Sequence, residues 1–322
     1  GMTCPDCRPD RREFIKAAAG ATLAASSALA AGKGETSETL VTTLYRSLTD
    51  EQKKTVVLPF DHALRSKVDN NWFISAARVG GFFNADQQAM IGEIFRGLYN
   101  PDFYPTVEKQ IQEDARGLKF YSVALFGEPG SGKFEFVLAG RHCTIRCDGD
   151  SVDGHAFGGP IFYGHQSGPA GTENPDHPGN LYWFQAKRAN EVFQALNGKQ
   201  REMALLKESP RYERGMETIR RKKRGERLDG LPGSEMTRDQ RQLVEKVLAD
   251  LFLPYRKKDV DEAMGYIKAN GGVESLAMSF SKGEDLGNDG VWDVWQLESP
   301  SMVWFFRGQP HVHVWVDIRA KA

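Results

Sequence analysis

Residues 119–148, KFYSVALFGEPGSGKFEFVLAGRHCTIRCD, contain the pattern around which the chain is organised. Aromatic and β-branched residues predict two strands, at 120–126 and 133–138, joined by a turn rich in Gly and Pro. The turn also fits the G-x-x-x-x-G-K pattern of a phosphate-binding loop. That loop requires Ser or Thr next and then a helix, whereas here Phe134 and a strand-like run follow. We therefore predict a β-hairpin.

The composition is that of an ordinary globular protein. The 322 residues are 40% hydrophobic and 26% charged, with a formal net charge of -1. This length suits one large domain or two small ones. The balanced charge gives no electrostatic basis for binding nucleic acid. No apolar run after residue 31 is long enough to cross a bilayer, so we expect no membrane span in the mature chain.

The N-terminal segment resembles a twin-arginine export signal. Arg11 and Arg12 precede Phe14 and the Ala-rich stretch 17–31, which ends in a small-residue cleavage site. We expect residues 1–30 to be a signal peptide and the mature protein to be periplasmic or secreted. The alternative, an amphipathic helix, does not explain the arginine pair.

Cys143 and Cys147 lie on one predicted strand. Four steps of ~3.3 Å place them roughly 13 Å apart on a regular strand, whereas a disulfide needs Cα atoms within about 7 Å. We expect two buried free thiols, and a disulfide only if a bulge or turn intervenes.

Four predicted helix starts share a capping box. In each, a Thr or Asn side chain and a Gln three residues later bond to each other's backbone N–H. The pairs are Thr49 with Gln52, Asn84 with Gln87, Asn197 with Gln200, and Thr237 with Gln240. The first and third boxes are 148 residues apart, and the second and fourth are 153 apart. These offsets predict an internal duplication. The alternative is two unrelated α+β segments that both use capping boxes.

The predicted fold class is α+β, with two pseudo-repeated halves packed as one domain. The first half covers residues 31–165, a connecting loop covers 166–180, and the second half covers 181–322. Each half is expected to contain a helical pair followed by an antiparallel β-meander. The expected helices are 89–98, 106–116, 242–251 and 260–269, and the expected strands are 120–126, 133–138, 143–147, 155–163, 275–280, 291–297, 302–306 and 311–318.

A basic run, Arg220-Arg-Lys-Lys-Arg224, lies within the charged segment 211–227. Acidic residues flank it, and it lacks the interleaved aromatic residues that stack on bases. We therefore expect a solvated helix end or a mobile loop.

The last predicted strand has two different faces. His311, His313, Trp315 and Asp317 share one face, and the alternating Val and Ile residues share the other, which we expect to be core. Two imidazoles at i and i+2 are ~6.6 Å apart along a strand. Both can reach one metal ion at ~2.0–2.1 Å from each nitrogen. H-x-H on a strand can therefore begin a zinc, copper or iron site.

Such a site needs a third ligand, and His142 is the first candidate because it lies in the equivalent β region of the first half. His165 and Asp317 are the next candidates. We predict one divalent transition metal ion bound by His142, His311 and His313. Arg141, His165, Trp315 and Asp317 are predicted to bind a ligand, and an Arg there favours an anionic one. The alternative is that these are surface or hydrogen-bonded histidines on a half-buried sheet.

Several motifs together resemble the DUF3500 family of exported bacterial proteins. They are Gly140-Arg141-His142, the segment 159–164, the helix 191–206 and His311-Val312-His313. The resemblance covers most of the mature chain. The family pattern has two adjacent histidines after the glycine, whereas this chain has Arg141 before His142. No activity is assigned to the family, so the resemblance implies an architecture and a compartment but no reaction.

Two functions are therefore expected. The first is an exported metal-dependent hydrolase or oxidoreductase with a His-lined cleft. The alternative is a non-catalytic extracytoplasmic module that binds a small molecule or carbohydrate in an aromatic cleft. That cleft would be formed by Trp292, Trp295, Trp304 and Trp315. The sequence predicts no catalytic nucleophile, because no G-x-S-x-G motif is present.

Overall fold

A computed structural model describes residues 35–167, 179–283 and 285–322. These described residues form one compact unit. The predicted signal peptide, 1–30, and most of the predicted connecting loop, 166–180, lie outside the described residues.

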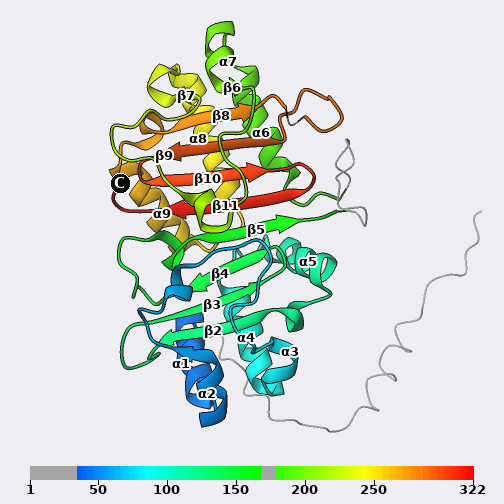
Figure 1. Ribbon diagram of the computed structural model, residues 1–322, viewed down its shortest axis with the longest axis vertical. Coiled ribbons are helices and arrows are strands. Elements are labelled where there is room, and N and C mark those ends of the chain that lie inside the picture. Colours follow the sequence, from blue (N-terminus) through cyan, green and yellow to red (C-terminus); the bar gives the residue numbers. More distant parts are fainter. Residues whose placement is uncertain (1–34, 168–178, 284) are drawn as a thin grey trace, which may run out of the picture. The chain divides into compact units, whose positions relative to one another are not determined.

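The described chain is a mixed α+β protein built on one large sheet (Figure 1). The strand order is β1-β2-β3-β4-β5-β11-β10-β9-β8-β6, and β7 also pairs with β8. The strands are β1 (Val57–Leu58), β2 (Ser122–Gly127), β3 (Phe134–Gly140), β4 (Cys143–Cys147), β5 (Ile161–His165), β6 (Leu205–Leu206), β7 (Leu231–Pro232), β8 (Ala277–Ser281), β9 (Val294–Ser299), β10 (Met302–Arg307) and β11 (Val312–Ile318). The pairs β1–β2 and β6–β8 are parallel, and the other pairs are antiparallel.

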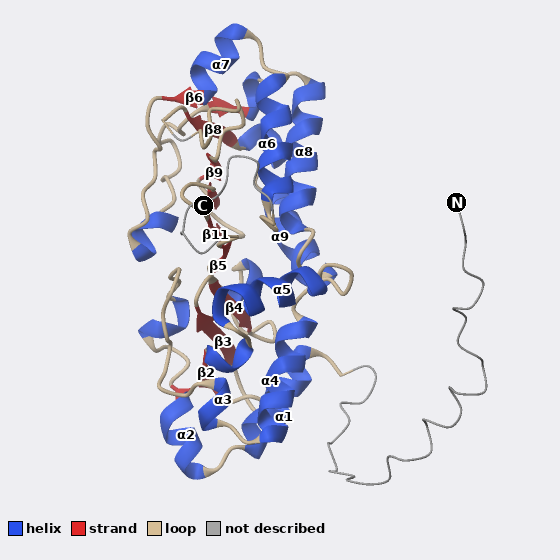
Figure 2. Ribbon diagram, turned by 90° about the vertical axis from the view of Figure 1, so that its right-hand side faces the viewer, coloured by secondary structure: helices blue, strands red, loops and turns tan. Residues whose placement is uncertain are grey.

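The longer helices cover one face of this sheet (Figure 2). The α-helices are α1 (Ser37–Ser47), α2 (Asp50–Val56), α3 (Val79–Phe82), α4 (Ala85–Gly97), α5 (Tyr104–Ala115), α6 (Trp183–Gln194), α7 (Gly198–Ala204), α8 (Arg238–Phe252) and α9 (Lys257–Ala269). Short 3-10 helices are η1 (Ala63–Ser66), η2 (Leu118–Phe120), η3 (Ala156–Gly158), η4 (Gly215–Ile219), η5 (Gly233–Glu235) and η6 (Gly272–Ser275). Each predicted helix and strand overlaps one of these elements, with ends that differ by a few residues. The largest difference is at β5, which begins at Ile161 and not at His155.

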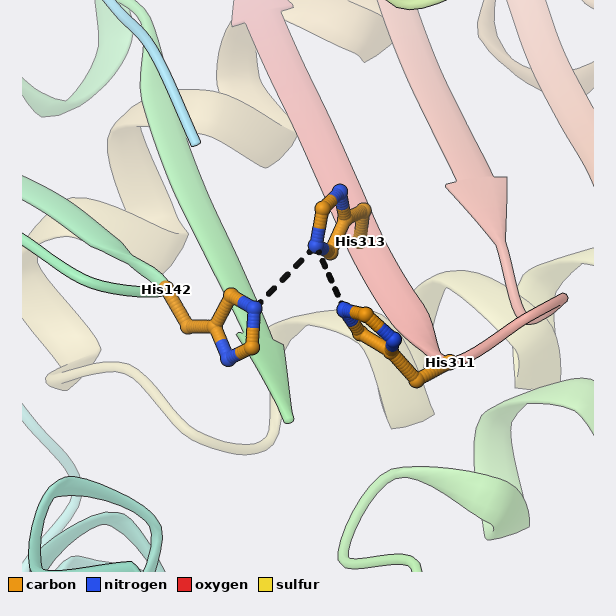
Figure 3. Close-up of side chains that lie close together, drawn as sticks. All are labelled: His142, His311 and His313. Atoms are coloured by element: carbon orange, nitrogen blue, oxygen red, sulfur yellow. Dashed lines mark hydrogen bonds between the residues drawn. The ribbon is translucent and has the colours of Figure 1, made fainter. Parts of the chain in front are cut away.

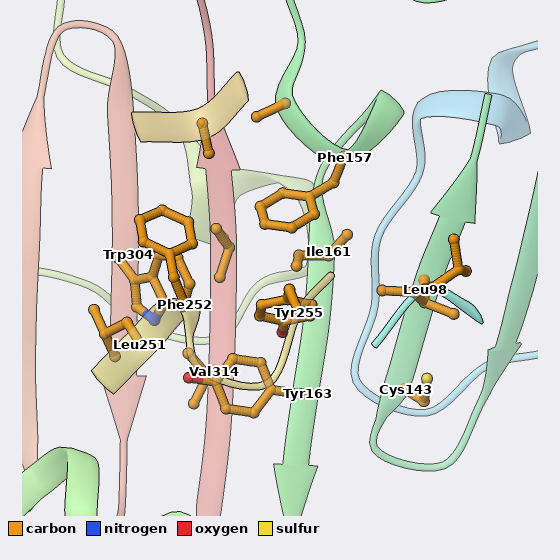
Figure 4. Close-up of a cluster of buried hydrophobic side chains, with 14 of the residues drawn as sticks. Leu98, Cys143, Phe157, Ile161, Tyr163, Leu251, Phe252, Tyr255, Trp304 and Val314 are labelled. Carbon is orange, nitrogen blue, oxygen red and sulfur yellow. The ribbon is translucent and has the colours of Figure 1, made fainter. Parts of the chain in front are cut away.

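The main core lies between the sheet and the long helices (Figure 4). Trp304 of β10 packs edge-to-face on Phe252 of α8, with ring centroids 5.1 Å apart. Phe157 contacts Tyr255 in the same way at 5.0 Å. Each fully buried side chain of this size contributes ~1.5–3 kcal/mol by leaving water, so this layer stabilises the packing of the helices on the sheet.

Two smaller apolar clusters lie away from the main core. One contains Val68, Ile219, Phe305 and Trp315, and the other contains Trp72. Val68 and Trp72 lie between β1 and α3, and Ile219 lies between β6 and β7. These two irregular segments therefore pack on strand residues that do not face the main core.

The predicted hairpin is confirmed. β2 and β3 pair antiparallel from Ser122↔Ala139 to Gly127↔Phe134. The glycine-rich turn joins two strands, and no helix follows it. The phosphate-loop pattern therefore has none of the geometry that binds phosphate.

All four predicted capping boxes are present. Their glutamines also bond to each other in pairs. Gln52 Nε2 donates to Gln87 Oε1 at 2.8 Å, and Gln200 Nε2 donates to Gln240 Oε1 at 2.8 Å. Each pair of bonded side chains thus links the starts of two helices.

Two predictions about buried residues have opposite outcomes. Cys143 and Cys147 are buried free thiols, as predicted. The predicted aromatic cleft is wrong, because Trp304 packs in the main core whereas Trp315 packs in the cluster with Ile219. Both indoles are fully buried, so the Trp side chains do not line one open groove.

Among the described residues, none of the helices combines the length and the apolar character needed to span a membrane.

Candidate metal centre

His142 is held in a tight turn between β3 and β4. Its φ is 57°, in the left-handed region that non-glycine residues seldom adopt. The His142 N–H donates to the Asn70 carbonyl at 2.9 Å, and Gln110 Nε2 donates to the His142 carbonyl at 3.0 Å. Bonds from two other segments therefore fix this turn and the direction of the imidazole.

His311 and His313 come from the other half of the chain, at the start of β11. Strand β5 lies between β4 and β11, pairing with both, and Gly164 of β5 is directly opposite His313. A Cβ at Gly164 would lie 3.4 Å from both the His142 and His313 rings, and 2.4 Å from the Val312 carbonyl oxygen. A larger residue at position 164 would touch both rings and would clash with the Val312 carbonyl, so glycine permits the close pairing of β5 with β11 beside the imidazoles.

The three imidazoles converge through their Nε2 atoms (Figure 3). His313 Nε2 lies 3.1 Å from His142 Nε2 and 3.0 Å from His311 Nε2. One ligand atom of each histidine lies within 4.8 Å of those of the other two. Two nitrogens bound tetrahedrally to one ion at 2.0–2.1 Å are about 3.3 Å apart. A small adjustment of these rings would therefore accommodate one metal ion.

Carboxylates face the other nitrogens of two of these rings. His313 Nδ1 lies 2.5 Å from Glu213 Oε1, and His142 Nδ1 lies 3.1 Å from Asp114 Oδ1. A carboxylate accepts from Nδ1–H and so selects the tautomer whose Nε2 carries a lone pair. Glu213 therefore favours a lone pair on His313 Nε2 that points into the cluster, whereas Asp114 lies beside His142 Nδ1 without the geometry of a hydrogen bond.

Glu213 is itself held by two further donors. Trp315 Nε1 donates to Glu213 Oε1 at 2.9 Å, and Arg307 Nη1 lies 2.8 Å from Glu213 Oε2. Burial alone would raise the pKa of Glu213, but the hydrogen bond from His313 and the charge of Arg307 lower that pKa to about 2. The carboxylate is thus ionised at neutral pH.

The histidines are shielded from solvent to different degrees. His142 is 3% exposed and His313 is 7% exposed, whereas His311 is half-buried. Burial lowers the pKa of His313 to about 3, against the opposing hydrogen bond to Glu213. Neutral imidazole is the form that binds metal ions, and His313 is in this form at neutral pH.

The other predicted site residues lie outside the histidine cluster. His165 is buried with its Nε2 2.7 Å from Glu113 Oε2. The Asp317 carboxylate lies 2.5 Å from His155 Nε2 and 3.1 Å from Arg221 Nε. Arg141 donates to Gln166 at 2.7 Å. His165 and Asp317 are therefore not the third member of the cluster. The predicted metal role of the three histidines and the ligand role of Arg141 stay predictions.

Trp315 is predicted to bind a ligand, but it is fully buried and donates to Glu213. Its place in the structure is that of a residue that orients Glu213.

The sequence analysis missed both carboxylates. Asp114 had a weak signal, because Gln110 and Asp114 are four residues apart on α5 and both contact His142. The sequence contains no signal for Glu213, because it lies in an irregular segment 100 residues from its partner His313.

The fold and the cluster define an α+β protein with three convergent histidines at the junction of β4, β5 and β11. A family model described as "Protein of unknown function (DUF3500)" matches residues 33–314, and the chain therefore belongs to this family. The match includes all three histidines of the cluster and confirms the resemblance predicted from the sequence. No curated protein and no solved structure matches.

Proposed function

We propose that this is an exported metalloprotein in which His142, His311 and His313 bind one divalent transition metal ion. One observation carries the proposal. The Nε2 atoms converge at 3.0 and 3.1 Å, while carboxylates face Nδ1 of His142 and His313. Without a metal ion these contacts are hydrogen bonds in which one nitrogen of each pair carries the proton, and an ion bound by all three nitrogens would replace those protons. The carboxylates match the outer partners that metal-binding histidines use.

The ligand set favours a particular class of ion and of chemistry. Imidazole ligands suit zinc, copper, iron and nickel. Three protein ligands leave a position for water or substrate, which is typical of catalytic sites. A bound ion of this kind would supply Lewis acidity or redox chemistry. We therefore infer a metal-dependent hydrolase or oxidoreductase acting on a small molecule.

Elemental analysis of the purified chain from residue 31 tests the metal centre. We expect about one equivalent of metal per chain, and its loss in the double variant His311→Ala/His313→Ala. His62→Asn is the matched control, because His62 caps η1 and lies outside the cluster. Absence of metal from the unmodified chain, even after reloading with zinc, copper or iron, would refute the proposal.

Activity screening separates the enzyme from a non-catalytic binding module. Hydrolase and oxidase assays of the metal-loaded chain are compared with the double variant. Turnover that depends on the histidines supports an enzyme, whereas stoichiometric metal without turnover over a broad substrate set supports a binding module.

We also propose export by the twin-arginine route, from the sequence of residues 1–30. A reporter fused to residues 1–33 should reach the periplasm in cells with the twin-arginine translocase and not in cells without it. Arg11→Lys/Arg12→Lys should abolish export, and export that persists in this variant would contradict the proposal.

We further propose that the two halves are copies of one unit. The strand order on either side of the β5–β11 pair is the same, with three further antiparallel strands and a parallel outer strand. A linked pair of capping boxes lies in each half. Superposing β2–β5 on β8–β11 tests this, because a single rotation must also superpose the linked helix starts.

A further inference from the structure

The segment between β6 and β7 contains a pocket of about 760 Å³ that belongs to neither the metal centre nor the main core. Six basic residues and three acidic residues are among those that line it. The basic residues are Arg211, Arg214, Arg220, Arg221, Lys222 and Arg227. The basic run that the sequence analysis expected to be merely solvated therefore contributes to a concave, positively charged site.

Three of the basic residues form ion pairs, two of them with strands of the sheet. Arg211 Nη2 lies 2.8 Å from Glu298 on β9, and Arg221 Nε lies 3.1 Å from Asp317 on β11. Lys222 pairs with Asp229 across the pocket segment at 3.2 Å. The contacts of Arg211 and Arg221 fix this segment against the sheet, and the Lys222–Asp229 pair links two parts of the segment itself.

The other three basic residues have a different environment. Arg214, Arg220 and Arg227 are exposed, and none has an acidic partner among the described residues. Each guanidinium presents a rigid fork of donors that matches a carboxylate or phosphate. Within the described part of the chain, the pocket is thus anchored to the sheet and is lined by three arginines without ion pairs, which outnumber the two carboxylates without ion pairs, Glu217 and Glu226.

We propose that this pocket binds a small polyanion, whose phosphate or carboxylate groups pair with Arg214, Arg220 and Arg227. The volume lies in the range of small-molecule sites. Tyr212 is the only aromatic residue among those that line the pocket, so stacking on successive bases of a nucleic acid is not supported. The proposal does not depend on the metal ion.

The pocket segment also contains Glu213, which orients His313. Glu213 lies between Tyr212 and Arg214 in the chain, and both neighbours line the pocket. A bound anion would therefore order the same backbone that positions the carboxylate of the metal centre.

Calorimetric titration of the metal-free chain tests the proposal. The probes are sodium pyrophosphate and sodium citrate, with sodium chloride at the same ionic strength as the reference. Removing metal first prevents either probe from binding at the histidines. We expect saturable binding with one site per chain. Tighter binding of pyrophosphate assigns phosphate chemistry to the pocket, and tighter binding of citrate assigns carboxylate chemistry.

Substitution of the unpaired arginines locates the site. Arg220→Gln/Arg227→Gln should weaken binding by at least about tenfold, because charge-assisted hydrogen bonds are lost. Arg214→Gln should weaken it independently. Arg224→Gln is the matched control, since it removes the same charge from the same run but lies outside this lining.

Three results would overturn the proposal. The first is heat that does not exceed that of sodium chloride. The second is equal weakening by Arg224→Gln and by the double variant, which would indicate only general charge attraction. The third is unchanged binding in both pocket variants. The melting temperature of each variant is measured without anion as a control. Equal values show that all variants are folded, so that a change in binding reflects the substituted residue.

Discussion

At the scale of single residues, Glu213 determines which nitrogen of His313 carries the proton. Its carboxylate faces His313 Nδ1 at 2.5 Å, and Arg307 and Trp315 keep it in place. An ionised partner raises the electron density on Nε2, the atom that faces the other histidines. Glu213 therefore acts through His313 and is a positioning residue.

Glu213→Gln should lower metal affinity by about 10- to 100-fold while leaving all three histidines intact. The amide retains the shape of the side chain but loses its charge. Chelator competition measures the affinity, and Glu217→Gln is the control because Glu217 is exposed on the same segment. An unchanged affinity in Glu213→Gln would show that the carboxylate does not support a metal ligand.

Cys143 gives a prediction about pH. Burial raises the pKa of this thiol from 9.0 to about 12. The folded protein thus holds the thiol proton more tightly than the unfolded chain does. The resulting stability is complete below pH 9 and is lost progressively as the pH rises toward 12.

Between pH 8 and pH 10, the unmodified chain should therefore lose about 1.4 kcal/mol more unfolding free energy than Cys143→Ala. Urea denaturation at the two pH values measures this difference. The other titrating groups are common to both proteins and cancel. An equal pH dependence in the two proteins would mean that Cys143 ionises as easily in the folded state.

At the scale of elements, the capping boxes are more than local helix signals. Gln200 and Gln240 bond to each other, and each also donates to a backbone carbonyl, at Glu235 and Ala195 respectively. One side chain thus satisfies a helix start and links it to a second helix. The loss of either Gln leaves buried polar atoms of the other without a partner.

Gln240→Ala should reduce the unfolding free energy by about 2 kcal/mol, from the lost cap and the lost buried hydrogen bonds. Gln242→Ala, at an exposed position of α8, should change it by less than about 0.5 kcal/mol. Adding Gln200→Ala to Gln240→Ala should cost less than the sum of the single changes, because the pair is already broken. Strict additivity in urea denaturation would contradict the proposed link.

The elements also show why some features were predictable from sequence and others were not. A capping box depends on four consecutive residues, and the alternation of β11 depends on its own side chains, so both were predicted correctly. The faces of different strands depend on register, which local patterns leave open. In the structure Phe305, not Trp304, is opposite Trp315, so the two indoles point to opposite sides of the sheet.

The histidine cluster was likewise predictable only in part. The spacing of His311 and His313 was visible in the sequence, and His142 was proposed from the expected equivalence of the halves. Glu213 was not proposed, because it lies in an irregular charged segment. Such a segment has no periodicity that would place it against β11.

At the scale of the whole unit, the candidate site exists only where the two halves meet. β5 belongs to the first half and β11 to the second, and their pairing brings His313 opposite Gly164. The proposed metal centre should therefore depend on the pairing of β5 with β11 as well as on its ligands.

Gly164→Ala tests this dependence without changing any histidine. The new Cβ would lie 2.4 Å from the Val312 carbonyl oxygen, so β11 must move relative to β5. We expect a loss of about 1–3 kcal/mol of unfolding free energy from overpacking, together with a marked loss of metal affinity. Gly92→Ala on α4 is the control, because its Cβ meets nothing within 4 Å and the change should stabilise the helix by about 0.5–1 kcal/mol. If Gly164→Ala bound metal as tightly as the unmodified chain, the ion would have to be held away from this strand pair, and the histidine centre would be wrong.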